Sequence, residues 1–168
     1  AETVAAFGTP VTAAALRVAE VEGRRRYDLS HGAPAEPGSL HPPLGGRGDI
    51  RAYFGGTLER AGVPQPQIPP ALEAFAARQR TLGLWTRPVE GARMALDAIA
   101  ALGIRQACVS NSDGRAEMHL VDCGVRDGLE FVVDSQIVEV EKPDPRIFAI
   151  ALARLGLPAE RSLYVGDI

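Results

Sequence analysis

The chain has 168 residues, of which 46% are hydrophobic and 23% charged, and its formal net charge at pH 7 is −3. This composition is typical of a folded globular protein, and one short basic cluster, Arg24–Arg26, is too little for a nucleic-acid-binding face. No apolar run is long enough to cross a membrane, and two cysteines are too few for a disulfide framework. We therefore expect a cytoplasmic protein that binds neither nucleic acid nor a membrane.

The first half of the chain begins with a predicted helix and a long loop. Thr9 and Pro10 provide an N-cap followed by proline at the first helical position, and apolar residues then recur at helical spacing. This pattern predicts a helix over residues 10–27. Residues 29–48 are rich in proline and glycine and include two histidines, which predicts a long loop, and a loop of that length is usually functional.

Two further helices are predicted before residue 82. Asp49 is placed to cap a helix over residues 50–61. Another helix is expected after Pro69–Pro70, over residues 71–80. Residues 1–82 are therefore expected to form an all-helical domain.

From residue 84 the pattern alternates between helix and strand. The expected helices cover about 89–102, 114–123 and 145–155, and the expected strands cover 104–109, 130–133 and 162–165. Alternating elements with short connections predict a parallel sheet covered by helices. Residues 83–168 are thus expected to form a doubly wound, Rossmann-like α/β core.

Polar residues follow each of the three predicted strands. They are Ser110–Asp113, Asp134–Ser135 with the segment leading to Lys142, and Gly166–Asp167. Ligands of open α/β sheets bind at the carboxyl ends of the strands. Three polar clusters at one edge therefore predict one site.

Each cluster also has a structural explanation. Ser110–Asp113 could cap the next helix, Gly166–Asp167 could form a turn, and Lys142 could be a surface residue. However, Lys142 is the single lysine beside 17 arginines, and the following Pro143 holds it extended, just before a helix start. An aspartate directly after an apolar strand is well placed to bind Mg²⁺. A hydroxyl, an ammonium and such a carboxylate are the groups that stabilise a transferring phosphoryl group.

Three segments of the second half resemble the second, third and fourth motifs of the haloacid dehalogenase-like hydrolase superfamily. They are Val109–Asp113, Glu141–Pro145 and Tyr164–Asp167, in the family's order. The resemblance covers roughly residues 84–168, and residues 1–82 resemble the helical C1-type cap of many members. It implies that Ser110, Asn111 and Lys142 bind substrate, with Ser110 and Lys142 catalytic, and that Asp167 holds Mg²⁺.

One family motif is missing from the chain. The resemblance implies an aspartyl-phosphate intermediate whose nucleophile belongs to a first motif, Asp-x-Asp, and no Asp-x-Asp occurs here. We therefore expect a fragment with an incomplete core and no turnover of its own. In the family fold the missing first strand lies between the strands that end at Ser110 and Asp167, so its absence exposes two strand edges.

The motifs also favour one chemistry within the family. Gly166–Asp167 is the metal-binding version of the fourth motif, which favours a Mg²⁺-dependent phosphatase of small phosphorylated metabolites over a dehalogenase. The alternatives are a haloacid dehalogenase-type hydrolase and a non-catalytic domain that binds a phosphorylated ligand or a partner protein.

Overall fold

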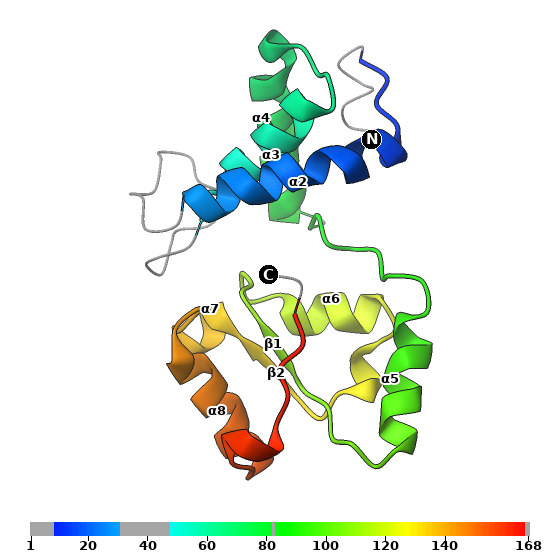
Figure 1. The fold of residues 1–168 in the computed structure, drawn as a ribbon, viewed down its shortest axis with the longest axis vertical. Helices are drawn as coiled ribbons and strands as arrows, with labels where there is room; N and C mark the ends of the chain where they lie inside the picture. Colours follow the sequence, from blue (N-terminus) through cyan, green and yellow to red (C-terminus); the bar gives the residue numbers. More distant parts are fainter. Residues whose placement is uncertain (1–8, 31–47, 82, 167–168) are drawn as a thin grey trace. The chain divides into compact units, whose positions relative to one another are not determined.

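The computed structural model describes residues 9–30, 48–81 and 83–166 of the chain, which divides into two compact units between Leu84 and Trp85 (Figure 1). Unit 1 is helical in its described part, and unit 2 combines helices with a parallel sheet. No helix within the described ranges has the length and apolar character needed to cross a membrane. The predicted loop over residues 29–48 falls almost entirely outside the described residues.

The described residues of unit 1 form three α-helices and one short 3-10 helix, namely α2 (Ala13–Leu29), α3 (Ile50–Arg60), η1 (Gln65–Gln67) and α4 (Ile68–Thr81). Helix α2 begins after Thr12, whose hydroxyl accepts a hydrogen bond from the Ala15 amide at 3.1 Å. The predicted N-cap at Thr9 is therefore wrong. The Thr9 hydroxyl instead donates a hydrogen bond to the Gln67 side chain at 2.6 Å. The two residues are 58 positions apart, so no local sequence pattern predicts this contact.

The other two helix starts of unit 1 follow from their first residues. Asp49 caps α3 as predicted, because its carboxylate accepts a hydrogen bond from the Arg51 amide at 2.8 Å. Helix α4 begins at Ile68, before the predicted residue 71. Pro69 and Pro70 fit into its first turn because amides there have no acceptor within the helix. The three helices enclose a small core made of Val11, Leu58, Val63, Ile68 and Ala71.

Glycine allows α2 and α3 to approach closely. A Cβ atom added at Gly23 of α2 would collide with the Thr57 hydroxyl and lie 2.5 Å from the Tyr53 carbonyl oxygen, both in α3. A Cβ atom added at Gly55, also in α3, would meet nothing within 4 Å. The same substitution should therefore have opposite effects at the two positions.

We expect Gly23→Ala to destabilise unit 1 by about 2 kcal/mol, because α2 must move away from α3 to admit the methyl group. Gly55→Ala is the matched control and should stabilise the helix by about 0.5–1 kcal/mol, since alanine loses less backbone entropy than glycine. Urea unfolding followed by far-UV circular dichroism measures both. Equal stabilities of the two variants would contradict the close helix crossing.

A carboxylate on α2 joins two arginines of the same helix. Glu22 accepts hydrogen bonds from Arg25 at 2.9 Å and from Arg26 at 2.8 Å, and Arg26 also pairs with Glu59 of α3 at 2.6 Å. The hydrogen bonds from Arg25 and then Arg26 lower the pKa of Glu22 from 4.5 to about 2. Folding therefore favours the ionised form of this carboxyl group.

Because the pKa of Glu22 is lower in the folded chain, its contribution to stability is fully present above pH 4.5 and is lost as the pH falls towards about 2. We expect the thermal midpoint of unit 1 to fall on acidification through that window, and to fall less in Glu22→Gln. The exposed Glu160 supplies the control variant, Glu160→Gln. If Glu22→Gln and the wild type lose the same stability, the proposed linkage is wrong.

Unit 2 contains a two-stranded parallel sheet and several helices. The elements are α5 (Ala92–Ala101), β1 (Cys108–Ser110), α6 (Ala116–Asp122), η2 (Arg126–Gly128), β2 (Val132–Asp134), α7 (Ser135–Val138), α8 (Pro145–Leu155) and η3 (Ala159–Arg161). The register pairs Val109 with Val133 and Ser110 with Asp134. The predicted parallel pairing of these two strands is confirmed, although both are shorter than predicted. In Figure 1, α8 lies on one side of the sheet and α5 and α6 on the other.

The last α-helix among the described residues, α8, follows its sequence signals closely. Asp144 caps α8 through the Arg146 amide at 2.9 Å, Pro145 occupies the first position, and Gly156 ends the helix with φ at +64°. Ile147 and Ala151 of this helix are buried with Val133 of β2. At the other end of unit 2, Val89 lies before α5 and not within it as predicted, because Gly91 takes a left-handed conformation ahead of the helix.

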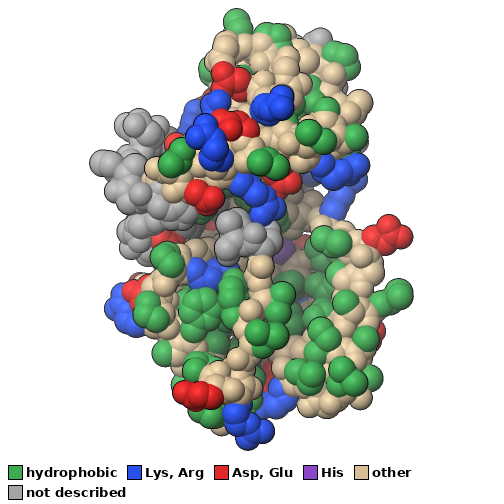
Figure 2. Space-filling model, viewed as in Figure 1, with side chains coloured by type: hydrophobic (Ala, Val, Ile, Leu, Met, Phe, Trp, Pro, Cys, Tyr) green, Lys and Arg blue, Asp and Glu red, His purple; other side chains and the backbone are tan. Residues whose placement is uncertain are grey.

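The third predicted strand, over residues 162–165, is not formed. The backbone hydrogen bonds found among the described residues include none from residues 163–166 to β1 or β2. Leu163 and Val165 are 88% and 82% exposed, and Figure 2 shows hydrophobic side chains gathered on this face of unit 2. A strand requires a neighbour to complete its ladder. The prediction failed because apolar alternation alone supplies no such neighbour.

Candidate active site

The carboxyl ends of β1 and β2 lie side by side in unit 2. Ser110 is the last residue of β1, and the register places it opposite Asp134, the last residue of β2. Both strands run in the same direction, so the segments that follow them leave the sheet at one edge. The sequence clusters after these two strands therefore meet in space.

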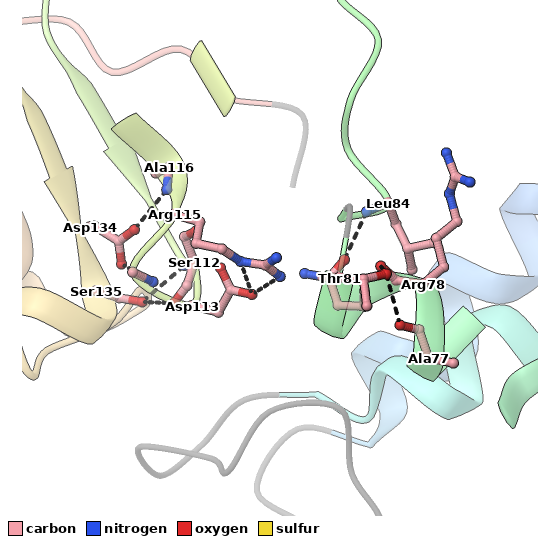
Figure 3. A network of polar contacts seen from close by, with 12 residues as sticks. Ala77, Arg78, Thr81, Leu84, Ser112, Asp113, Arg115, Ala116, Asp134 and Ser135 are labelled. Carbon is pink, nitrogen blue, oxygen red and sulfur yellow. Dashed lines mark hydrogen bonds and ion pairs between the residues drawn. The ribbon is translucent and has the colours of Figure 1, made fainter. Parts of the chain in front are cut away.

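Asp134 organises the segment that follows β1. Its carboxylate accepts hydrogen bonds from the amides of Gly114 at 3.1 Å, Ala116 at 3.0 Å and Gln136 at 2.9 Å, and the residue is only 3% exposed. Figure 3 shows the carboxylate directed at the start of α6. Helix α6 is therefore capped by a side chain from β2. Its own N-cap residue, Arg115, makes no side-chain cap.

Ser135 makes a second connection to the same segment. Its fully buried hydroxyl accepts a hydrogen bond from the Ser112 amide at 3.0 Å and donates one to the Ser112 carbonyl oxygen at 3.2 Å (Figure 3). The sequence placed Asp134 and Ser135 at the sheet edge, but it did not predict a role for either residue. The loop after Ser110 is thus held at several points by residues 18 to 23 positions further along the chain.

Asn111 and Lys142 are in direct contact. The Asn111 side-chain amide donates to the Lys142 carbonyl oxygen at 2.9 Å, and its oxygen accepts a hydrogen bond from the Lys142 amide at 2.8 Å. The two residues are 31 positions apart in the chain. The structure therefore brings the lysine segment to the end of β1, where Ser110 and Asn111 lie.

The Lys142 ammonium meets an aromatic residue that sequence reasoning did not single out. Nζ donates a hydrogen bond to the Tyr164 hydroxyl at 2.9 Å. Nζ lies 5.4 Å from the ring centroid. This distance is close to the sum of the hydrogen-bond length and the distance from the hydroxyl oxygen to the centroid, so Nζ lies beyond the hydroxyl end of the ring and not above its face. The ring itself packs edge-on against Phe148 of α8, with centroids 4.9 Å apart. In the sequence, the position of Tyr164 just before Gly166–Asp167 was the one sign that it could belong to the site.

The turn after Tyr164 lies against the same hydroxyl. A Cβ atom added at Gly166 would lie 2.6 Å from the Tyr164 hydroxyl oxygen. Tyr164 thus contacts both Lys142 and Gly166, the residue that precedes Asp167 in sequence. Asp167 itself, the predicted Mg²⁺ ligand, falls outside the described residues, and the part of the chain that is described holds no group of three or more potential metal-binding side chains.

A nucleophilic thiol is not part of this site. Cys108 lies in β1, two residues before Ser110. Burial raises the pKa of the Cys108 thiol above its ordinary value. The thiol is therefore protonated near neutral pH and a poor nucleophile.

A family model described as haloacid dehalogenase-like hydrolase matches residues 4–168. The chain belongs to this family of hydrolases, which confirms the resemblance read from its motifs. It is 46% identical over 72 residues to haloacid dehalogenase-like hydrolase domain-containing protein 3 of Danio rerio, a match that covers 43% of this chain and 30% of that protein. The match to the Mus musculus protein of the same name covers 44% of its length, so the chain spans less than half of these relatives.

Relatives with phosphatase names match a larger share of the chain. The chain is 28% identical over 153 residues to a phosphoglycolate phosphatase of Thiobacillus denitrificans, covering 83% of the chain and 67% of that enzyme. It is 30% identical over 134 residues to a glyceraldehyde 3-phosphate phosphatase of Methanopyrus kandleri, covering 79% and 53%.

A solved structure supports the fold. The crystal structure of a dehalogenase with an intermediate complex aligns with a TM-score of 0.55 and 17% identity, over 93% of this chain and 65% of that one. At 17% sequence identity, the structural similarity supports the fold alone. The predicted architecture, a helical part beside an incomplete Rossmann-like core, is confirmed.

Proposed function

We propose that this chain supplies the helical cap and part of the core of a Mg²⁺-dependent phosphatase that acts on small phosphorylated metabolites. The observation that carries the proposal is the pair of hydrogen bonds between Asn111 and Lys142, at 2.9 and 2.8 Å. They keep a lysine beside the strand end that carries the Ser110 hydroxyl. Membership of a hydrolase family and the phosphatase names of several relatives support the same activity.

The proposed roles follow from the charge of a phosphoryl group. Ser110 donates a hydrogen bond to a phosphoryl oxygen, and the Lys142 ammonium offsets the negative charge that accumulates during transfer. Asp167 is the proposed Mg²⁺ ligand, and a single carboxylate fits a cation that takes its other ligands from water and substrate oxygens. When bound, Mg²⁺ supplies further charge stabilisation. The family resemblance places the attacking carboxylate of an aspartyl-phosphate mechanism in an Asp-x-Asp motif. These 168 residues contain no such motif, so we assign this carboxylate to sequence outside them.

The substrate class is argued from the names of the relatives. Three of them are named phosphatases of phosphoglycolate, glyceraldehyde 3-phosphate and N-acetylmuramic acid 6-phosphate. All three compounds are small phosphomonoesters. We therefore propose a compound of this class as the substrate, and unit 1 as the cap domain of the enzyme.

Phosphate release by the complete gene product tests the proposal. The protein is incubated with a panel of small phosphomonoesters, with Mg²⁺ or with EDTA, beside the 168-residue chain alone. We expect Mg²⁺-dependent release of phosphate from the complete protein and none from the chain alone. Halide release from a 2-haloacid without phosphate release would favour the dehalogenase alternative, and binding of phosphate without any turnover would favour the non-catalytic one.

A further inference from the structure

Lys142 is held at two separate points. At its peptide, Asn111 uses both its side-chain oxygen and its side-chain nitrogen, in the way that a neighbouring strand would. At the tip of its side chain, Nζ donates to the Tyr164 hydroxyl. We propose that Asn111 and Tyr164 are positioning residues that together fix the direction of the Lys142 ammonium.

The peptide contact restricts the backbone from which the lysine side chain starts. Asn111 bonds the amide and the carbonyl of Lys142, and the next residue, Pro143, has a fixed φ and no amide hydrogen. Asn111 is itself attached directly to Ser110, the end of β1. A change in the Asn111 side chain should therefore act directly on the position of the Lys142 peptide, and on a bound ligand only through Lys142. This role differs from the substrate contact predicted for Asn111 from the sequence.

The side-chain contact restricts the four-carbon stem. An unrestrained lysine side chain loses rotamer entropy when it is fixed, so a lysine without such a contact is a poor preformed anion site. The Tyr164 ring is held in turn by the edge of Phe148, with an interplanar angle of 69°. An ammonium has three donor hydrogens, so the bond to Tyr164 leaves two for an anion. The inference rests on the proposed function in this one respect, that the anion is a phosphoryl group.

Lys142 can be observed alone because it is the single lysine of the chain. Labelling with [¹⁵N]lysine gives one amide signal in an NMR spectrum, and labelling with [¹³Cε]lysine gives one side-chain methylene signal. The amide reports the bond to Asn111 through its rate of hydrogen exchange. The methylene reports the bond to Tyr164 through its relaxation, which measures motion on the picosecond to nanosecond timescale.

We expect Asn111→Ala to accelerate exchange of the Lys142 amide at least about tenfold, the factor that corresponds to about 1.4 kcal/mol. Asn111→Asp keeps the oxygen that accepts the amide, so most of the protection should remain. Asn111→Asp also tests the role of Asn111 if Asn111→Ala fails to fold. The control is Gln136→Ala, an exposed side chain at the same sheet edge, which should leave the rate unchanged. Wild-type exchange rates in Asn111→Ala would overturn the role of Asn111.

Tyr164→Phe removes one oxygen and keeps the ring. We expect the Lys142 methylene to become as mobile as that of a free lysine, while the amide exchange rate stays at the wild-type value. Unchanged methylene mobility would overturn the role of Tyr164. All these spectra are recorded without ligand, so they do not depend on phosphatase activity. A titration with inorganic phosphate is separate, and if phosphate leaves the wild-type methylene signal unmoved, it is the proposed function that fails.

Discussion

Replacing Lys142 with alanine is expected to lower kcat/KM of the complete protein for a phosphomonoester by about 10²–10³-fold, the usual cost of removing one donor that stabilises transition-state charge. The loss should lie mainly in kcat, because the ammonium stabilises charge that develops only in the transition state. Lys142→Arg should recover only part of the rate, since a planar guanidinium cannot occupy the place of a compact ammonium. Steady-state phosphate release measures all three enzymes.

A matched control separates this loss from a general effect of charge. Arg161→Ala removes an exposed cation of η3 in the same unit and should leave the rate unchanged. Circular dichroism shows that each variant is folded. Equal rates for Lys142→Ala and Arg161→Ala would remove Lys142 from the proposed mechanism.

Asp134→Ala is expected to give the largest loss of stability, about 3 kcal/mol or more. It would leave three amides, those of Gly114, Ala116 and Gln136, without their acceptor. The bond from Ala116 is buried and the other two are part-buried, and a buried donor without a partner costs about 1–3 kcal/mol. Asp134→Asn keeps one side-chain oxygen and should lose about half as much. Urea unfolding followed by circular dichroism gives the free energies.

The control for this prediction is Asp122→Ala, which removes an exposed carboxylate at the end of α6 and should change the stability by less than about 0.5 kcal/mol. If Asp134→Ala is no less stable than this control, the segment after β1 is not held by the buried carboxylate. A loss of stability in Asp134→Ala should also reduce activity, because the segment that Asp134 holds begins directly after Ser110.

Several predictions that depend on neighbouring residues were confirmed. Asp49 and Asp144 cap the helices that begin directly after them, and Gly156 ends α8. Each of these features needs only hydrogen bonds or backbone angles within a few residues, which local sequence determines. The parallel pairing of β1 with β2 followed from the alternation of elements, and it brought the segments after Ser110 and Asp134 to one edge.

Other predictions were wrong or incomplete because contacts between distant residues decide the outcome. Thr9 was expected to cap α2, but its hydroxyl bonds to Gln67. The strand over residues 162–165 is absent, because a strand forms only beside a partner. Tyr164 was not expected beside the Lys142 ammonium, and the assignment of Asp167 to Mg²⁺ stays a prediction.

The sequence by itself determined the family, the helix boundaries set by local caps, and the residues Ser110, Asn111 and Lys142 as a group at one sheet edge. Tertiary structure alone decided which side chains hold that group together, namely Asp134, Ser135 and Tyr164. The physical reason is the separation along the chain. A cap acts within one helical turn, whereas these contacts join residues 18 to 31 positions apart. The register of β1 with β2 brings the segments after Ser110 and Asp134 together, and the Tyr164 ring reaches Lys142 where it packs on Phe148.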